Sequence, residues 1–496
     1  MTAPSLLRAA FCIAISGSQM AGAQTQAEPV AMSFGAARQQ MAATSGALAS
    51  AGHGVRASED QAAALKALNR PVISGTAQLV EYQKTLSIDL TGGKDRFAEN
   101  ASDYLADLPG QFPPEFQAIV SQVSGRIEQA LPGLLDAIPD ALSFRTRDTI
   151  FRPTVTAALP LYSGGAIPAI QRGALAGVAL ARAQAAGAQS LADVRLVQLY
   201  FGQQLAEQLL LSTTQTRDAL DRHLANARIM EREGVLPHVR TLQVEVARNT
   251  AERARIRAQL ELRTASEALA RYLDVEGQGV QPTTPLFVNS QPLAPVDDYI
   301  ASATDQHPQV RAAQAGEEIA RAGVDLARSR YLPQAYAFGE YNLDRGNALP
   351  VEPDWIVGVG VRYTFLSNID RAKTLSAAQE REQAAAQTGR EARKLVAMET
   401  SRAWDLVDTA RQSFLLLDGN IKAAQENLRV QEISFREGEG TVADVIDAQA
   451  ALATARTERI AAAYEYDVAL AALLAATNRS DEFASHLARG DRVVAP

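Results

Sequence analysis

The sequence predicts a mainly helical chain of two duplicated halves that also carries four membrane-type β-strands. Three observations lead to this fold class: very long alanine-rich helical stretches, a short motif that occurs twice, and segments in which apolar and polar residues alternate. The 496 residues are 47% hydrophobic but only 6% aromatic, so much of the apolar content is alanine. Alanine favours helices that pack closely against one another.

The repeated motif is a helix end, a glycine turn and a second helix. In the second half it runs from Phe435 to Thr441, and in the first half Arg232, Glu233 and Gly234 repeat the sequence Arg436-Glu437-Gly438. Glycine can take the left-handed conformation that ends a helix, and we expect this of both Gly438 and Gly440. Thr441 can cap the next helix. Two copies indicate duplication rather than an array.

After the turn the best sequence match changes its spacing. Val239 and Gln243 align with Val445 and Gln449, two positions further on than the residues before the turn. We therefore expect the first turn to be two residues shorter than the second. Pro237 then lies near the start of its second helix, where proline is tolerated.

Residues 1–23 are predicted to form a secretory signal peptide. Arg8 supplies the positive start, residues 9–16 an apolar segment too short to span a membrane, and Ala21 to Ala23 a cleavage motif. Cleavage removes Cys12, the single cysteine. We expect an exported mature protein without disulfides or a lipid anchor.

The first half is predicted as a helix, a strand pair and a helical hairpin. Pro71 ends the first helix, and strands at 72–88 and 149–162 flank a long segment, 89–148, that is rich in glycine and proline and contains one short helix near 115–131. Such a connection is more often an exposed or functional loop. The predicted order is helix 24–71, strand pair 72–162, then long helix, tip turn near 234 and return helix over 163–273.

The second half repeats this order after a connector that contains proline and glycine. Its first helix is interrupted near His307 and Pro308, and its strands are predicted at 332–344 and 355–366. The predicted order is connector 274–300, helix 301–331, strand pair 332–366, long helix, tip turn 437–441 and return helix over 367–478, and a tail at 479–496 without a strong pattern.

The last predicted strand has an apolar face. Trp355, Val357, Val359, Val361 and Tyr363 lie on that face, and glycine, arginine and threonine lie on the other. The ten steps from residue 355 to 365, with strand tilt, span roughly the 25 Å apolar band of an outer-membrane barrel. Four strands cannot close a barrel, and an open edge cannot face lipid. Several chains must therefore share one barrel.

The predicted long helices, 166–232 and 370–436, are each roughly 100 Å long. Each half also has two shorter helices whose lengths add up to about the same. A long helix can therefore lie antiparallel to two short ones stacked end to end. Lateral packing is required, because a helix of this length is not stable when solvated alone.

Charge and motif content argue against other functions. The formal net charge of −8 leaves no basic patch for nucleic acid. The five histidines lack metal-ligand spacing, and Gly92-Gly93-Lys94 lacks the rest of a phosphate-binding loop, so we predict no enzyme, metal or cofactor. A secreted coiled-coil structural or adhesive protein would explain the helices. It would not explain the strands, and it usually shows sustained heptads.

Together these features closely resemble the TolC-like outer-membrane efflux family over nearly all of the mature chain. The resemblance lies in the duplicated halves, the strand exit from Leu159 to Gly165, and the segment 435–449, which is similar to the family's tip motif. It implies a homotrimer with a twelve-stranded barrel in outer-membrane lipid, a twelve-helix tube in the periplasm, and loop 89–148 outside the cell. It also implies docking to a periplasmic adaptor and an inner-membrane efflux or ABC transporter, as in tripartite efflux or type I secretion.

The resemblance also assigns roles to tip residues. Asp444 and Asp447 would ring the periplasmic mouth; their spacing puts both on one helix face, and three chains would give two cation-favouring rings. Crowding of like charges should raise some of their pKa values. The alternative is a solvated helix start, where the helix dipole stabilises Asp. The adaptor is expected to contact the two turns, which comprise Arg232, Glu233, Gly234, Phe435, Arg436, Glu437, Gly438, Gly440 and Thr441.

Three residues depart from the family pattern. Phe435 stands where the family has a tyrosine that helps to hold the mouth closed, and Gly440 stands where it has a basic residue. His238 occupies the position that aligns with Asp444. If the duct closes, its latch differs from the family's best-known one.

Overall fold

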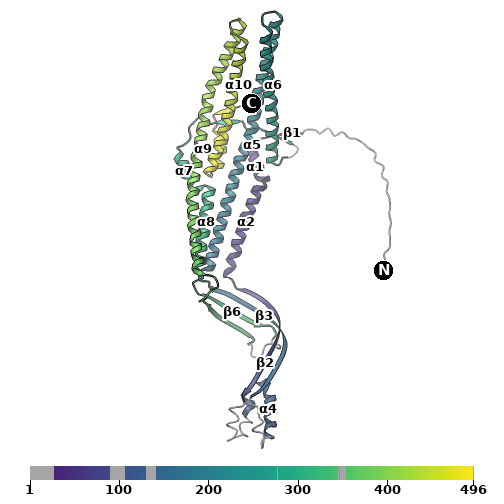
Figure 1. Ribbon diagram of the computed structural model, residues 1–496, viewed down its shortest axis with the longest axis vertical. Coiled ribbons are helices and arrows are strands. Elements are labelled where there is room, and N and C mark those ends of the chain that lie inside the picture. The colour runs from purple at the N-terminus through teal and green to yellow at the C-terminus, as the bar shows by residue number, and fades with distance from the viewer. Residues whose placement is uncertain are drawn as a thin grey trace, which may run out of the picture. The chain divides into compact units, whose positions relative to one another are not determined.

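The computed structural model describes residues 27–89, 107–129, 141–275, 278–344, 346 and 353–494. The predicted fold class is confirmed, because these residues are mainly helical with a small number of strands (Figure 1). They fall into a helical unit, formed by residues up to Lys66, Pro168–Arg328 and Asn368 onward, and a strand unit, formed by Ala67–Ile167 and Ser329–Ser367. The predicted signal peptide lies outside the described residues.

Two helical hairpins dominate the helical unit (Figure 1). Each pairs a long helix of 66 or 67 residues with a return helix of 35 residues. Each half also contributes two shorter helices. The bounds are α1 (Phe34–Thr44), α2 (Gly46–Lys66), α5 (Ala166–Arg232), α6 (His238–Tyr272), α7 (Val296–Gln306), α8 (Pro308–Ser329), α9 (Arg371–Arg436) and α10 (Val442–Ala476).

The breaks between the short helices have the same construction. Ser45 separates α1 from α2, and His307 separates α7 from α8, each with an extended backbone. The Leu48 amide donates to Ser45 Oγ at 3.4 Å, and the Gln309 amide donates to His307 Nδ1 at 3.1 Å. A side chain thus satisfies one free amide at the start of each second helix.

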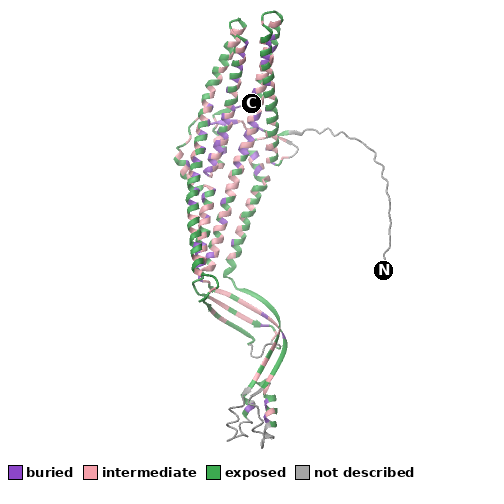
Figure 2. Cartoon of the chain, viewed as in Figure 1, coloured by how far each residue is buried: buried purple, intermediate pink, exposed green. Residues whose placement is uncertain are grey.

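The core of the helical unit is aromatic and includes elements that the sequence did not predict. Strand β1 (Ala27–Met32) pairs in parallel with β4 (Gln278–Pro282), and β5 (Leu286–Val288) pairs with β8 (Arg492–Val494) near α11 (Phe483–Ala488). Buried residues gather where these strands meet α1, α5 and α10 (Figure 2). The rings of Phe34, Tyr200, Phe201, Phe287 and Phe483 pack there with centroids 5.1–6.3 Å apart.

These short elements correct three predicted boundaries. The connector 274–300 contains two strands and ends before α7 begins at Val296, and the tail 479–496 is folded rather than patternless. The segment 24–71 begins with a strand before its helices. Strands of three to six residues leave too little periodicity to be recognised in a sequence.

The strand unit is a four-stranded antiparallel sheet in the order β2-β3-β6-β7. Its strands are β2 (Val72–Asp89), β3 (Ala141–Tyr162), β6 (Gln334–Asn342) and β7 (Trp355–Arg362). β3 starts eight residues before the predicted 149, because its polar first part pairs with β2 as far as Asp89 opposite Ala141. The segment 89–148 also contains η2 (Leu108–Gln111) and α4 (Pro114–Gln129), and the rest of it lies outside the described residues.

Two glycines in β7 make room for aromatic rings from β6. Gly358 lies opposite Phe338 and Gly360 opposite Tyr336. A Cβ atom at Gly360 would lie 2.7 Å from Tyr336 Cζ, and one at Gly358 would lie 3.0 Å from Phe338 Cζ. The Arg362 guanidinium lies 5.6 Å from the centre of the Tyr336 ring. The glycines are therefore required by ring packing.

Gly360→Val should push the Tyr336 ring away and disturb its contact with Arg362. Overpacking of this kind costs about 1–3 kcal/mol. Gly75→Val in β2 is the control, because a Cβ atom there has no neighbour within 4 Å. Thermal unfolding followed by circular dichroism should show a lower midpoint for Gly360→Val only. Equal midpoints in the two variants would contradict this account of the glycines.

Candidate functional site

The two tip turns have the same hydrogen-bonded structure. In each, four successive backbone amides donate to carbonyl groups of the preceding helix at 2.9–3.2 Å. The donors Glu233, Gly234, Val235 and Leu236 reach Ile229, Glu231, Met230 and Met230, and the donors Glu437, Gly438, Glu439 and Gly440 reach Ile433, Phe435, Ser434 and Ser434. Gly234 and Gly438 are left-handed, with φ of +77° and +76°. A side chain there would be strained, so glycine suits both turns.

Gly440 serves the turn in a different way from the one predicted. Its φ is not in the left-handed region, and a Cβ atom there would lie 3.0 Å from Ser434 Cβ and 3.2 Å from the Phe435 nitrogen. The expectation that both Gly438 and Gly440 are left-handed is therefore wrong for Gly440. Close approach of the chain to the preceding helix explains this glycine.

The predicted two-residue difference between the turns is also wrong. α6 is preceded by Pro237 and α10 by Thr441, and both helices have 35 residues. Both are followed by a left-handed residue, Asp274 with φ 55° and Asn478 with φ 56°. The spacing therefore stays constant from the tips to the ends of the return helices.

The buried positions of the return helices give the same alignment. Thr241, Val244, Ala251, Ala258 and Leu269 of α6 coincide, at this constant spacing, with Val445, Ala448, Ala455, Ala462 and Leu473 of α10. The identities at Val239 and Gln243 misled the sequence alignment, because burial and not local similarity sets the register. Arg240, and not His238, is the counterpart of Asp444.

Asp444 caps its own helix. The Asp444 amide donates to Thr441 Oγ1 at 3.3 Å, and the Thr441 amide donates to Asp444 Oδ2 at 2.8 Å, which forms a reciprocal capping box. Hydrogen bonds from the Thr441 hydroxyl and amide lower the pKa of Asp444, and the charge of Arg240 adds to this effect. Within one chain the shift is thus opposite to the one expected from crowded carboxylates. Asp447 is also exposed, one turn further along α10.

Apolar residues join the two hairpins just behind the tips. Leu224, Ala227, Val244 and Val442 form a buried cluster, and Phe435 packs against it. The Phe435 ring therefore supports the tip by packing and does not need a hydroxyl group. Arg232, Glu233, Gly234, Arg436, Glu437, Gly438 and Thr441 are exposed around it.

A cavity of about 510 Å³ lies beside this cluster, between the two hairpins. His223 and Glu432 line it, with His223 Nε2 3.4 Å from Glu432 Oε1. Burial lowers the pKa of His223. His238, by contrast, is exposed and places Nδ1 2.7 Å from Glu231 Oε1, so it is a polar surface contact at the start of α6.

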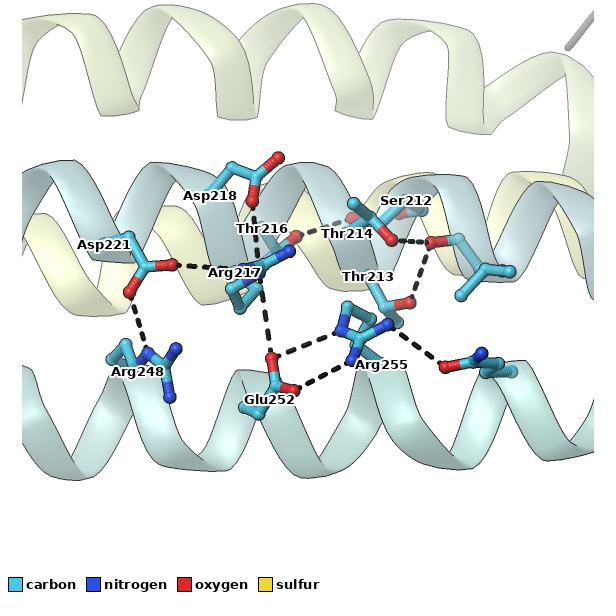
Figure 3. A network of polar contacts seen from close by, with 12 residues as sticks. Ser212, Thr213, Thr214, Thr216, Arg217, Asp218, Asp221, Arg248, Glu252 and Arg255 are labelled. Atoms are coloured by element: carbon cyan, nitrogen blue, oxygen red, sulfur yellow. Dashed lines mark hydrogen bonds and ion pairs between the residues drawn. The ribbon is translucent and has the colours of Figure 1, made fainter.

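Charged residues link α5 to α6 further from the tip (Figure 3). Arg248 Nε lies 2.7 Å from Asp221 Oδ1, and Arg217 lies 3.4 Å from Asp221 and 3.7 Å from Glu252. Arg255 pairs with Glu252 at 2.9 Å. This network was not predicted from the sequence, although its charged residues recur there at helical spacing. Such pairs near the surface stabilise modestly, and here they hold the return helix beside α5.

The outer face of β7 is apolar and exposed. Trp355, Val357, Val359, Val361 and Tyr363 each expose 44–73% of their surface, with Tyr363 just after the strand ends. The face continues across the sheet, because Val357 lies in register with Gly339, Ala157 and Ile73. The opposite face carries an ion pair between Arg152 and Glu340 at 2.8 Å and two pairs of hydroxyl groups. This division is typical of outer-membrane strands.

Among the helices that the structure describes, none is long and apolar enough to cross a membrane. Within the described ranges no group of three or more His, Cys, Asp or Glu side chains is arranged to hold a metal ion.

Comparisons with known proteins match part of the chain to a known family. Residues 299–479 match the profile of the Outer membrane efflux protein family. Protein CyaE of Bordetella pertussis is 33% identical over 189 residues, which make up 36% of this chain and 38% of CyaE. The match thus spans less than half the length of that relative.

Solved structures match over most of the chain. CusC superposes with a TM-score of 0.69 at 16% identity, covering 96% of this chain and 98% of CusC. VceC of Vibrio cholerae gives 0.67 at 12% identity, covering 90% of this chain and 96% of VceC. The open state of the MtrE outer membrane channel of Neisseria gonorrhoeae gives 0.66 at 14% identity, covering 90% of this chain and 89% of MtrE.

The fold is thus similar to that of the solved outer-membrane proteins VceC and MtrE. The match of residues 299–479 to the Outer membrane efflux protein family, together with the similar solved structures, confirms the resemblance seen in the sequence. The predicted location, in the outer membrane with the helical part in the periplasm, is confirmed as well. A secreted coiled-coil structural or adhesive protein is not supported.

Val359→Arg should destabilise the protein in the membrane. A charge on the lipid face near the bilayer midplane costs about 2–4 kcal/mol. The control is Ile356→Arg, because Ile356 lies on the opposite face of β7, which already carries Arg362. Heat resistance of the membrane-extracted protein on gel electrophoresis should fall more for Val359→Arg. An equal effect of both variants would argue against a lipid-facing Val359.

Proposed function

We propose that this chain is the exit duct of a tripartite efflux pump or a type I secretion system. It would act as a passive conduit rather than an enzyme, with no cofactor. The equivalence of the two hairpins carries the proposal: both reverse at the same turn and both return over 35 residues. Three copies would then give twelve helices with six equivalent tips, which is the symmetry that a closed tube needs.

A homotrimer would also supply hydrogen-bond partners for the two edge strands of the sheet. β2 and β7 are its two edge strands, and each leaves one row of backbone groups unpaired within the sheet. Exposure of such an edge to lipid is too costly, because hydrocarbon offers no hydrogen-bond partner. Pairing of β2 with β7 of the next copy would close twelve strands around the pore, with the apolar face of β7 in outer-membrane lipid.

The partners would be a periplasmic adaptor and, through it, an inner-membrane efflux or ABC transporter. We place the adaptor contact at the exposed turns around Gly234 and Gly438, because they are small-residue ends of equivalent hairpins. Solute would then pass directly from the pump into the helical tube.

Gly438→Val tests this contact. A β-branched residue is strained at φ +76°, so the turn should change shape while the helices and strands stay folded. Gly419→Val is the control, because Gly419 lies within α9 with an ordinary φ and no atom within 4 Å of an added Cβ. Export by cells should fail for Gly438→Val only, with trimers still in the membrane. Normal export by Gly438→Val would place the docking site elsewhere.

Asp444 and Asp447 would form two carboxylate rings at the periplasmic mouth. Both are exposed near the start of α10. The capping box gives Asp444 a structural role as well, whereas that box does not involve Asp447. Carboxylates gathered at a narrow opening concentrate cations and retard anions.

Asp444→Asn combined with Asp447→Asn should lower the preference for cations in planar bilayers. It should also weaken block by multivalent cations added from the periplasmic side, because the attracting charge is removed. Asparagine preserves side-chain size and is accepted near a helix start. Asp405→Asn, which removes an exposed charge from α9 far from the turn, should change neither property. Unchanged selectivity and block in the double variant would leave these carboxylates as a helix start only.

A further inference from the structure

We infer that Arg240 belongs to the mouth at the level of Asp444, where its positive charge offsets one carboxylate per chain and admits anionic solutes. The inference rests on the proposed function, because only a closed assembly has a mouth. Asp444 and Asp447 contribute two negative charges per chain, and the positive charge of Arg240 reduces the net charge of the three residues to −1. Three chains would carry a net charge of −3 at the mouth instead of −6.

Position in the repeat places Arg240 at this level. Arg240 is the third residue of α6, and Asp444 is the third residue of α10. The preceding turns share their hydrogen bonds, and the helices that follow share their buried positions. In a tube built from equivalent hairpins the two side chains therefore lie at equal height, as do Gln243 and Asp447.

Packing within one chain brings the two positions close together. Val244 of α6 and Val442 of α10 belong to the same buried cluster. Arg240 lies one helical turn before Val244, and Asp444 lies two residues after Val442. The charge of Arg240 reaches Asp444, since it helps to lower the pKa of that carboxyl group.

Local helix energetics do not explain an arginine here. The start of a helix carries a partial positive charge, which stabilises Asp444 at its position and disfavours a cation at the same position of α6. Arg240 Nη1 donates to Gln243 Oε1 at 3.0 Å, and this partner on the same helix is a neutral amide. Because the helix dipole disfavours an arginine at this position, Arg240 is better explained by the solutes that pass it.

The chemical consequence is a mouth with alternating charges. Three Asp444 carboxylates would alternate with three Arg240 guanidinium groups, and the neighbouring level would alternate Asp447 with Gln243. A guanidinium group binds carboxylates and phosphates through paired hydrogen bonds. The solutes that suit this opening are therefore organic anions and zwitterions as well as cations.

Reversal potentials across planar bilayers under a KCl gradient test the role of Arg240. Arg240→Gln should raise the ratio of potassium to chloride permeability at least about twofold, because three positive charges leave the opening. Arg240→Lys keeps the charge and should keep the parent ratio. Arg253→Gln should also keep it, because Arg253 lies 13 residues along α6 and on the other side of the helix.

A second comparison measures the same permeability ratio in variants that lack the two carboxylates. With Arg240 in place, the Asp444→Asn and Asp447→Asn double variant should become anion-selective, and adding Arg240→Gln should return it to near neutrality. The role of Arg240 would be overturned, and the duct left intact, by the following result. The parent conducts, Arg240→Gln leaves its potassium-to-chloride permeability ratio unchanged, and the double variant is nonselective. A parent that assembles but never conducts would overturn both.

Discussion

The structure depends on one local interaction, the hydrogen-bonded glycine turn that reverses each long helix. A helix of 66 or 67 residues is stable only beside other helices, and the turns at Gly234 and Gly438 provide such a neighbour from the same chain. Because both turns use the same bonds, the two hairpins are interchangeable in shape. In the proposed duct, that equivalence would let a small number of copies close a tube, and it would set which side chains share a level at the opening.

Much of the fold could be predicted from the sequence, because long helices and alternating strands leave strong periodic signals. The bounds of α5 agree with the stretch expected at 166–232, and α9 begins within one residue of its predicted start. The strands β1, β4, β5 and β8 were missed, because they are short and gain their stability from the aromatic core. The polar first part of β3 was missed because its pairing with β2, and not an apolar pattern, makes it a strand.

The tips show where residue similarity misleads. The matches of Val239 to Val445 and of Gln243 to Gln449 suggested a shorter first turn and placed His238 opposite Asp444. Buried positions gave the correct alignment, since packing tolerates changes of residue type but not of register. Only then does Arg240 become the counterpart of Asp444. The capping box likewise shows that Asp444 stabilises its helix start while its side chain remains exposed.

The central claim is that three chains close one duct, and cross-linking at the sheet edges tests it most directly. The single cysteine, Cys12, lies in the predicted signal peptide, so a mature chain with one new cysteine in β2 and one in β7 has no competing thiol. Several positions along the two edges would sample the register. The account predicts that oxidation in membranes links chains into covalent trimers and no larger species. Chains that remain single, or links that stop at two chains at every position, would contradict it.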